Sequence, residues 1–190
     1  NIFHAYLLNC DGIVTTPVIS NAGNLSSQLG YMKASKDGKC IVSAEMSSNG
    51  HVLLYDLDNT NGSITFKEVI SQTASKHYYG VEFSPNDEVI YVSNNSSIHQ
   101  YDRFATNVCS TETIISHVGF PAGPMQLAPD NKIYISIDNQ HMMSVISDPD
   151  NLTAPGLNIA YQSLGGSARY SIPSFFYPFP THQTNFEYNL

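Results

Sequence analysis

One phrase of about 13 residues occurs three times in this 190-residue chain and constrains its fold more than any other feature. The three copies occupy residues 31–43, 80–93 and 124–136. Their equivalent residues Ser35, Ser84 and Ala128 lie 49 and 44 positions apart. Each copy contains a short apolar run, a turn of Asp, Asn or Gly, and a second run rich in Ile, Val and Tyr. This pattern predicts a β-hairpin, because Asp, Asn and Gly accept turn geometry while β-branched and aromatic residues favour strands.

Two further apolar patterns follow each hairpin. A strand-like phrase recurs at residues 51–57, 97–103 and 141–147, with Tyr55, Tyr101 and Val145 in equivalent places. A last apolar stretch closes each unit, at residues 13–20, 64–71, 113–118 and 157–164. Four strands in about 44 to 49 residues are typical of a β-propeller blade. No segment keeps a 3.6-residue apolar period, so the sequence predicts an all-β fold with blades of four antiparallel strands.

About three and a half such repeats are present. Counting back one repeat from Tyr55 reaches Tyr6, so the chain is expected to begin inside an incomplete blade. The predicted units are residues 1–29 as the end of that blade, 30–76, 77–119 and 120–166 as blades, and 167–190 as a closing or docking tail. A propeller needs four to eight blades. Either the tail completes a four-bladed ring, or the chain is the C-terminal part of a larger propeller; three prolines in residues 171–180 favour the second, because proline cannot donate to a sheet ladder.

Composition excludes several kinds of partner. Eight basic against 16 acidic side chains give a net charge of −8, with no basic cluster to attract nucleic acid or anionic lipid. No apolar run approaches the roughly 18 residues that a membrane span requires. Cys10, Cys40 and Cys109 lack the spacing of a zinc site or a disulfide framework. Each is expected to be a small buried hydrophobic residue.

No catalytic or cofactor motif stands out. The chain has no nucleophile elbow, phosphate-binding loop or dinucleotide fingerprint. Its seven histidines show no metal-ligand spacing, and His4 and His99 share one slot of the repeat, which repeat packing explains. The seven are His4, His51, His77, His99, His117, His141 and His182. The sequence therefore assigns no catalytic residue, no metal ligand and no cofactor, and it leaves the ligand-binding residues unknown.

Acidic residues near the predicted strand ends are candidates for binding a cation or a sugar. Asp56 and Asp102 follow the repeat tyrosines, but the favoured interpretation is that they end strands by accepting hydrogen bonds from turn amides. Asp148, Asp150 and Asn151 form a cluster without the alternating ladder and distal Glu of a calcium loop. Calcium binding is accordingly not the favoured interpretation.

Aromatic residues could also mark a binding face, because their rings pack on the apolar faces of sugars. They gather at Tyr78-Tyr79 and at residues 175–179. For the second group, covering a sheet edge or docking a neighbouring domain is the favoured interpretation.

Four phrases follow one another along the chain, at residues 80–86 with 89–93, 126–134, 144–150 and 172–175. In this order, over residues 30 to 177, they resemble the YVTN or WD-like propellers of large secreted surface proteins of Bacteroidetes, of the gliding-motility or type IX secretion substrate type. Asn131 stands where that family usually has Gly, and Ser174 replaces an expected Asn. The resemblance implies a secreted modular protein.

The resemblance and the absence of catalytic motifs favour a non-enzymatic binding or scaffold module, extracellular or at the cell surface, that serves adhesion. Its expected partners are a surface protein or glycan, together with neighbouring domains or missing blades; nucleic acid and membrane insertion are not expected. The alternative is a lactonase-like propeller hydrolase, because residues 51–62 are similar to blade segments of those enzymes. Such an enzyme needs acid, base or metal residues that converge at the central channel. A second alternative is a purely structural spacer.

Overall fold

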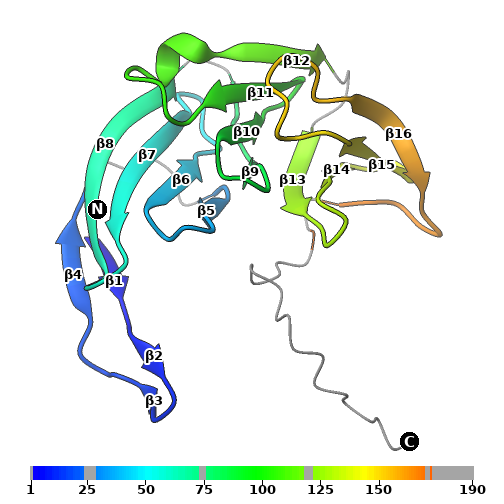
Figure 1. The fold of residues 1–190 in the computed structure, drawn as a ribbon. Coiled ribbons are helices and arrows are strands. Elements are labelled where there is room, and N and C mark those ends of the chain that lie inside the picture. Colours follow the sequence, from blue (N-terminus) through cyan, green and yellow to red (C-terminus); the bar gives the residue numbers. More distant parts are fainter. Residues whose placement is uncertain (1, 24–28, 73–75, 118–121, 170–171, 173–190) are drawn as a thin grey trace, which may run out of the picture.

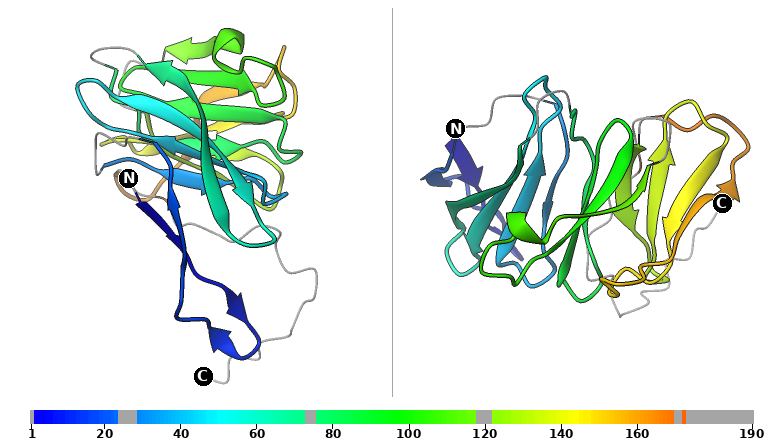
Figure 2. Two further views of the ribbon diagram at one scale, coloured as in Figure 1. Left: turned by 90° about the vertical axis from the view of Figure 1, so that its left-hand side faces the viewer. Right: turned by 90° about the horizontal axis from the view of Figure 1, so that it is seen from above.

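The protein is all-β, as the repeat predicts. The computed structural model describes residues 2–23, 29–72, 76–117, 122–169 and 172. Three four-stranded antiparallel sheets, here called blades 1, 2 and 3, lie side by side in an arc (Figure 1). Seen from above, the three sheets pack face to face (Figure 2). The helical content of the described part of the chain is a single 3-10 turn, η1 (Cys109–Thr111).

Within each blade the strands follow one another in chain order from the concave side of the arc outward. Blade 1 contains β5 (Met32–Ala34), β6 (Cys40–Ala44), β7 (His51–Asp58) and β8 (Ser63–Gln72). Blade 2 contains β9 (Val81–Phe83), β10 (Val89–Ser93), β11 (Ser97–Asp102) and β12 (Thr113–His117). Blade 3 contains β13 (Ala122–Leu127), β14 (Ile133–Ile137), β15 (Met142–Ile146) and β16 (Leu157–Ser163). The inner strands β5, β9 and β13 therefore come from the first run of each repeated phrase.

The repeated turn has the same backbone conformation in all three blades. Gly38, Asp87 and Asn131 are equivalent in the repeat and have φ values of 67°, 62° and 61°. This left-handed region is open to glycine and is tolerated by Asn and Asp better than by most residues. The turn chemistry of the sequence thus fixes each inner hairpin.

The hydrophobic core lies between the blades, because both faces of each central strand are covered. In β10, Ile90 and Val92 enter the core shared with blade 1, whereas Val89 and Tyr91 enter the core shared with blade 3. All four side chains have no exposed surface. A strand buried on both faces reads as a continuous apolar run, which is the pattern of residues 89–92.

The N-terminal segment, predicted to be the end of an incomplete blade, forms a two-stranded antiparallel ribbon packed on blade 1. β1 (Ile2–Ala5) pairs with β4 (Val18–Asn21), and the short strands β2 (Leu8–Asn9) and β3 (Gly12–Ile13) continue the ribbon beyond blade 1 (Figure 1). Phe3 packs edge-on against Tyr55 of blade 1, with 5.1 Å between ring centroids. On the opposite side of the ribbon, Ile2 and Ile19 are exposed beside His4 and Asn21.

The cysteines correct one sequence expectation. Cys40 is buried in β6, but Cys10 and Cys109 are exposed, and all three are free thiols. Cys10 lies in the turn between β2 and β3, and Cys109 opens η1, so both lie outside the strands. The expectation that all three are buried is therefore wrong for two of them.

The thiols are expected to differ in reactivity. Burial raises the pKa of Cys40 to about 11, which leaves almost no reactive thiolate at pH 8. A maleimide added to the native protein at about pH 8 should therefore modify Cys10 and Cys109 within minutes and Cys40 only after unfolding. Peptide mass spectrometry counts the labels, and rapid labelling of Cys40 in the native protein would contradict the buried position of β6.

No helix in the described residues is both long and apolar enough to cross a membrane.

Candidate functional site

Three different polar side chains occupy one equivalent position in the three inner strands. Lys33, Glu82 and Gln126 each stand two residues before the repeat positions Ser35, Ser84 and Ala128, on β5, β9 and β13. Lys33 Nζ lies 3.1 Å from Glu82 Oε2 and donates a hydrogen bond of 2.8 Å to Gln126 Oε1. We call these three residues the inner-strand cluster.

The inner-strand cluster is largely shielded from solvent. The side chains of Lys33 and Glu82 are 15% and 8% exposed, and Gln126 is buried. Lys33 begins on blade 1 and reaches across the inner edge of blade 2 to blade 3, so the cluster joins all three blades.

The backbone fixes the Glu82 carboxylate. Its Oε1 accepts a hydrogen bond of 3.0 Å from the Phe83 amide, and its Oε2 accepts one of 3.0 Å from the Leu127 amide of blade 3. Gln126 is also fixed, because its amide nitrogen donates to the Leu127 carbonyl. A preorganised carboxylate and ammonium cost little to align when a reacting group arrives.

The contacts described leave hydrogen-bonding capacity for a further partner. A lysine ammonium has three donors, and Glu82 and Gln126 account for two. Each carboxylate oxygen can accept more than one hydrogen bond, and Glu82 Oε1 accepts the Phe83 amide alone among the contacts described. The cluster can thus donate to one oxygen of a ligand and accept a proton from another.

Sequence reasoning missed this cluster, although it aligned the three phrases that contain it. The signal was present: at a position that must face the same way in every blade, the repeat changes from Lys to Glu to Gln. Repeat packing explains a residue that recurs. It does not explain three polar residues that differ yet complement one another.

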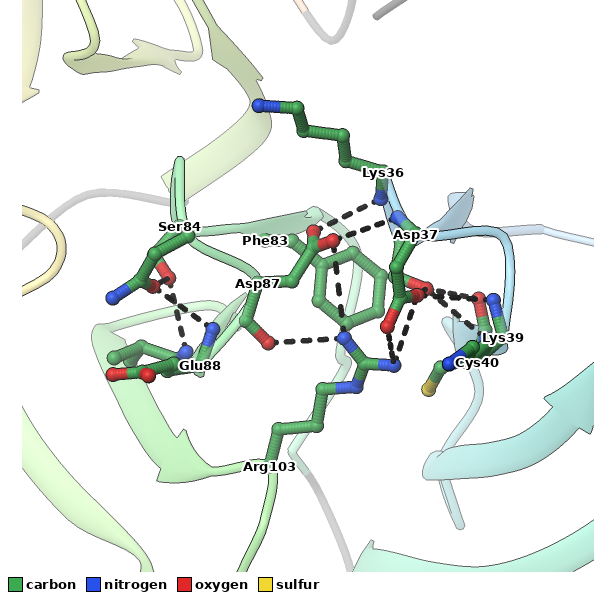
Figure 3. Close-up of polar contacts among 12 residues, drawn as sticks. Lys36, Asp37, Lys39, Cys40, Phe83, Ser84, Asp87, Glu88 and Arg103 are labelled. Carbon is green, nitrogen blue, oxygen red and sulfur yellow. Dashed lines mark hydrogen bonds and ion pairs between the residues drawn. The ribbon is translucent and has the colours of Figure 1, made fainter. Parts of the chain in front are cut away.

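Blades 1 and 2 are held together by a second polar group, here called the blade joint and formed by Asp37, Asp87 and Arg103 (Figure 3). Arg103 Nη2 donates to both oxygens of Asp37, at 3.1 and 2.9 Å, and Nη1 donates to the Asp87 carbonyl at 3.2 Å. The Asp87 carboxylate accepts the amides of Lys36 and Asp37, at 2.9 and 2.8 Å. Arg103 also lies 5.7 Å from the centre of the Phe83 ring. Its side chain is 6% exposed.

The blade joint should make stability depend on pH. Partial burial opposes ionisation of Asp37, but hydrogen bonds from the Ser35 hydroxyl, the Lys39 amide and Arg103 outweigh it and lower the pKa below its usual value. A carboxyl with a lowered pKa stabilises the folded state above its ordinary pKa and loses that contribution as the pH falls through the folded value.

We therefore expect Asp37→Asn to lower the thermal midpoint at pH 7 and to have a shrinking effect below about pH 4. Thermal unfolding of both proteins between about pH 3 and pH 7 measures this difference. A difference that stays constant over the whole range would show that the Asp37 charge does not contribute.

The histidines that share a repeat slot have different environments. His4 is exposed on β1, whereas His99 is fully buried on β11. His99 Nδ1 lies 2.8 Å from Glu112 Oε1, and its Nε2 lies 2.7 Å from the Asn94 side-chain nitrogen. Among the residues that the structure describes, no group of three or more His, Cys, Asp or Glu is arranged to hold a metal ion.

The acidic candidates mostly hold turns. Asp102 accepts the Phe104 amide at 2.9 Å, as expected of a residue that ends a strand. Asp56 lies within β7 and faces Lys67 at 4.0 Å, so it does not end its strand. In the cluster at residues 148–151, the Asn151 side chain donates to Asp148. Asp150 accepts the Asn86 amide of blade 2.

The two aromatic candidates in the described residues, Tyr78 and Tyr79, have different environments. Tyr78 is fully buried, and its hydroxyl lies 2.6 Å from Ser71 Oγ, so it does not form a binding surface. Tyr79 contacts Tyr31 edge-on, with 5.3 Å between ring centroids. Residues 175–179 lie outside the described part of the chain.

No protein-family model matches the chain, and no curated protein matches its sequence. Solved structures do match its fold. The periplasmic gluconolactonase PpgL of Pseudomonas aeruginosa has a TM-score of 0.60 at 14% identity, with 90% of this chain and 50% of that chain covered. A protein from Lactobacillus plantarum scores 0.61 at 14% identity, covering 87% and 50%. A Bacteroides uniformis protein assigned as a 6-phosphogluconolactonase scores 0.58 at 14% identity, covering 87% and 49%.

The chain therefore has the β-propeller fold of lactonase-type structures and spans about half the length of those that it matches. This finding contradicts the predicted non-enzymatic binding or scaffold module. Two of these three similar structures are named as lactonases. The comparisons give no support to the resemblance to Bacteroidetes surface proteins beyond a shared propeller fold.

Proposed function

We propose that this chain is part of a lactonase-like propeller hydrolase and that the inner-strand cluster is where the lactone ring opens. The observation that carries the proposal is the convergence of Lys33, Glu82 and Gln126 from three inner strands. The lactonase-like hydrolase, which the sequence offered as an alternative, requires polar residues that converge in this way. A channel lined by small apolar residues would have counted against a hydrolase.

The cluster has the chemistry that ester hydrolysis needs. In this proposal Lys33 donates to the lactone carbonyl oxygen and stabilises the negative charge that develops when water attacks. Glu82 accepts a proton from that water as the new carbon–oxygen bond forms. The ring carbon–oxygen bond then breaks, and the proton passes to the departing ring oxygen, which becomes a hydroxyl. Gln126 holds the ammonium in place.

The proposed substrate class is a polyhydroxylated lactone. Similar structures are named for gluconolactone and its 6-phosphate, and this supports the class.

For the location of the whole protein, we propose the extracellular or cell-surface setting expected from the sequence. A similar structure is named as periplasmic. The predicted protein, glycan and blade partners stay predictions.

Hydrolysis of glucono-1,5-lactone by the whole protein tests the proposal. Acid release at constant pH, corrected for hydrolysis in buffer alone, is expected to rise in proportion to protein concentration and to saturate with substrate. A simple unsubstituted lactone of the same ring size serves as the matched comparison and is expected to react more slowly. A rate equal to that of buffer for both lactones would refute a lactonase.

A further inference from the structure

The blade joint and the inner-strand cluster occupy the same two inner hairpins. Lys33 lies on β5, and the turn that contains Asp37 follows directly; Glu82 lies on β9, and the turn that contains Asp87 follows directly. The joint therefore acts on the ends of the very strands that bring Lys33 and Glu82 together.

β5 and β9 belong to different sheets, so no strand ladder sets their separation. Besides the shared hydrophobic core, polar contacts at both ends hold the two strands together. At one end, the Tyr31 amide donates a hydrogen bond of 2.9 Å to the Tyr79 carbonyl. At the other end, the Asp87 carboxylate accepts hydrogen bonds from two backbone amides in the turn of blade 1. Arg103 of blade 2 donates a hydrogen bond to Asp37 in the same turn. Lys33 lies between these anchors, so movement at the joint changes where its ammonium points.

The joint is particular to blade 2 rather than part of the repeat. The positions equivalent to Arg103 hold Leu57 and Ser147 in the other blades. The positions equivalent to Asp87 hold Gly38 and Asn131. The positions equivalent to Asp37 hold Asn86 and Asp130, so only Asp87 and Arg103 are particular to this blade.

From this placement we propose that Arg103 is a positioning residue for the inner-strand cluster: it holds the turn of blade 1 on blade 2 so that Lys33 meets Glu82. A buried guanidinium suits this role, because its planar fork can bind both oxygens of Asp37 and the Asp87 carbonyl at once. Lysine carries the same charge but cannot make all these contacts.

The test is the energetic coupling between Lys33 and Glu82, measured with and without Arg103. Urea midpoints of Lys33→Met, Glu82→Gln and the double variant are compared in the wild-type background, where the two single shifts are expected to be clearly non-additive. In an Arg103→Met background the shifts should become additive. Arg103→Lys is expected to lose at least about half of the coupling. It replaces Arg103→Met in the experiment if the methionine variant does not fold.

Arg169, the other arginine, has a side chain that is 70% exposed and supplies the matched control. Arg169→Met should leave the coupling unchanged. Equal coupling with and without Arg103 would overturn the proposal, because Arg103 would then stabilise the fold without positioning Lys33.

The effect on turnover rests on the proposed function. Arg103→Lys is expected to lower kcat by roughly ten- to a hundredfold with a smaller change in KM, because a misplaced group acts mainly on the reacting state. The coupling is measured by unfolding alone. The positioning test therefore stays valid if the lactonase proposal fails. If Arg103→Lys removes the coupling but leaves kcat unchanged, Arg103 positions Lys33 without an effect on the reaction.

Discussion

Lys33→Met should remove most of the lactone hydrolysis of the whole protein while leaving its fold in place. Methionine keeps the length and the apolar stem of lysine but cannot donate to a developing oxyanion. Loss of one such donor in a preorganised site typically lowers kcat by about 10²- to 10³-fold. Initial rates across a range of substrate concentrations measure kcat and KM separately.

The same substitution leaves the Glu82 carboxylate without its cation, so a loss of stability must be separated from a loss of chemistry. Glu82 keeps its two backbone donors, and the cost is expected to be about 1–3 kcal/mol. Combining Lys33→Met with Glu82→Gln removes the unpaired charge together with the acceptor of one backbone amide, and it should restore none of the activity. Lys39→Met, at an exposed lysine of the neighbouring turn, should change neither stability nor activity. Near-normal kcat in Lys33→Met would exclude a catalytic role for Lys33.

Leu54→Ala should be among the most destabilising single truncations in blade 1. Leu54 lies on β7, has no exposed surface and belongs to the core shared by blades 1 and 2. Removing a fully buried leucine side chain leaves a cavity and costs about 2–5 kcal/mol. Urea unfolding followed by circular dichroism measures the change.

An exposed leucine provides the comparison. Leu8 on β2 is 72% exposed, so Leu8→Ala is expected to change stability by less than about 0.5 kcal/mol. Equal effects of the two substitutions would mean that the blades do not share the core described here.

Much of the fold could be predicted from the sequence because its determinants are local and repeated. The turns at Gly38, Asp87 and Asn131 use residue types that accept a positive φ. The apolar runs on either side predict strands. Burial on both faces of β10 likewise follows from an unbroken apolar run.

The N-terminal ribbon shows where local patterns are insufficient. Residues 2–8 and 13–20 each look like one continuous strand, yet β1 ends at Ala5 and β4 begins at Val18. Leu8 and Ile13 pair with each other beyond the sheet and stay exposed. Apolar periodicity identifies strands, but it does not state which neighbours cover them.

The inner-strand cluster depends on contacts between residues 49 and 93 positions apart, which no short motif contains. Catalytic motifs are searched as compact patterns, whereas a propeller assembles its centre from one residue in each blade. For a repeat of this kind, the informative comparison is between equivalent positions. The position two residues before Ser35, Ser84 and Ala128 holds a different polar residue in each blade. This is the variation expected of a functional site rather than of a structural repeat.

The location of the proposed site is tested most directly by a crystal structure of the whole protein with gluconate, the hydroxy acid that the proposed reaction releases. The account predicts a carboxylate oxygen of gluconate within about 3 Å of Lys33 Nζ, with Glu82 and Gln126 in contact with the ligand. Gluconate bound at another place, with the Lys33–Glu82–Gln126 contacts unchanged, would contradict it.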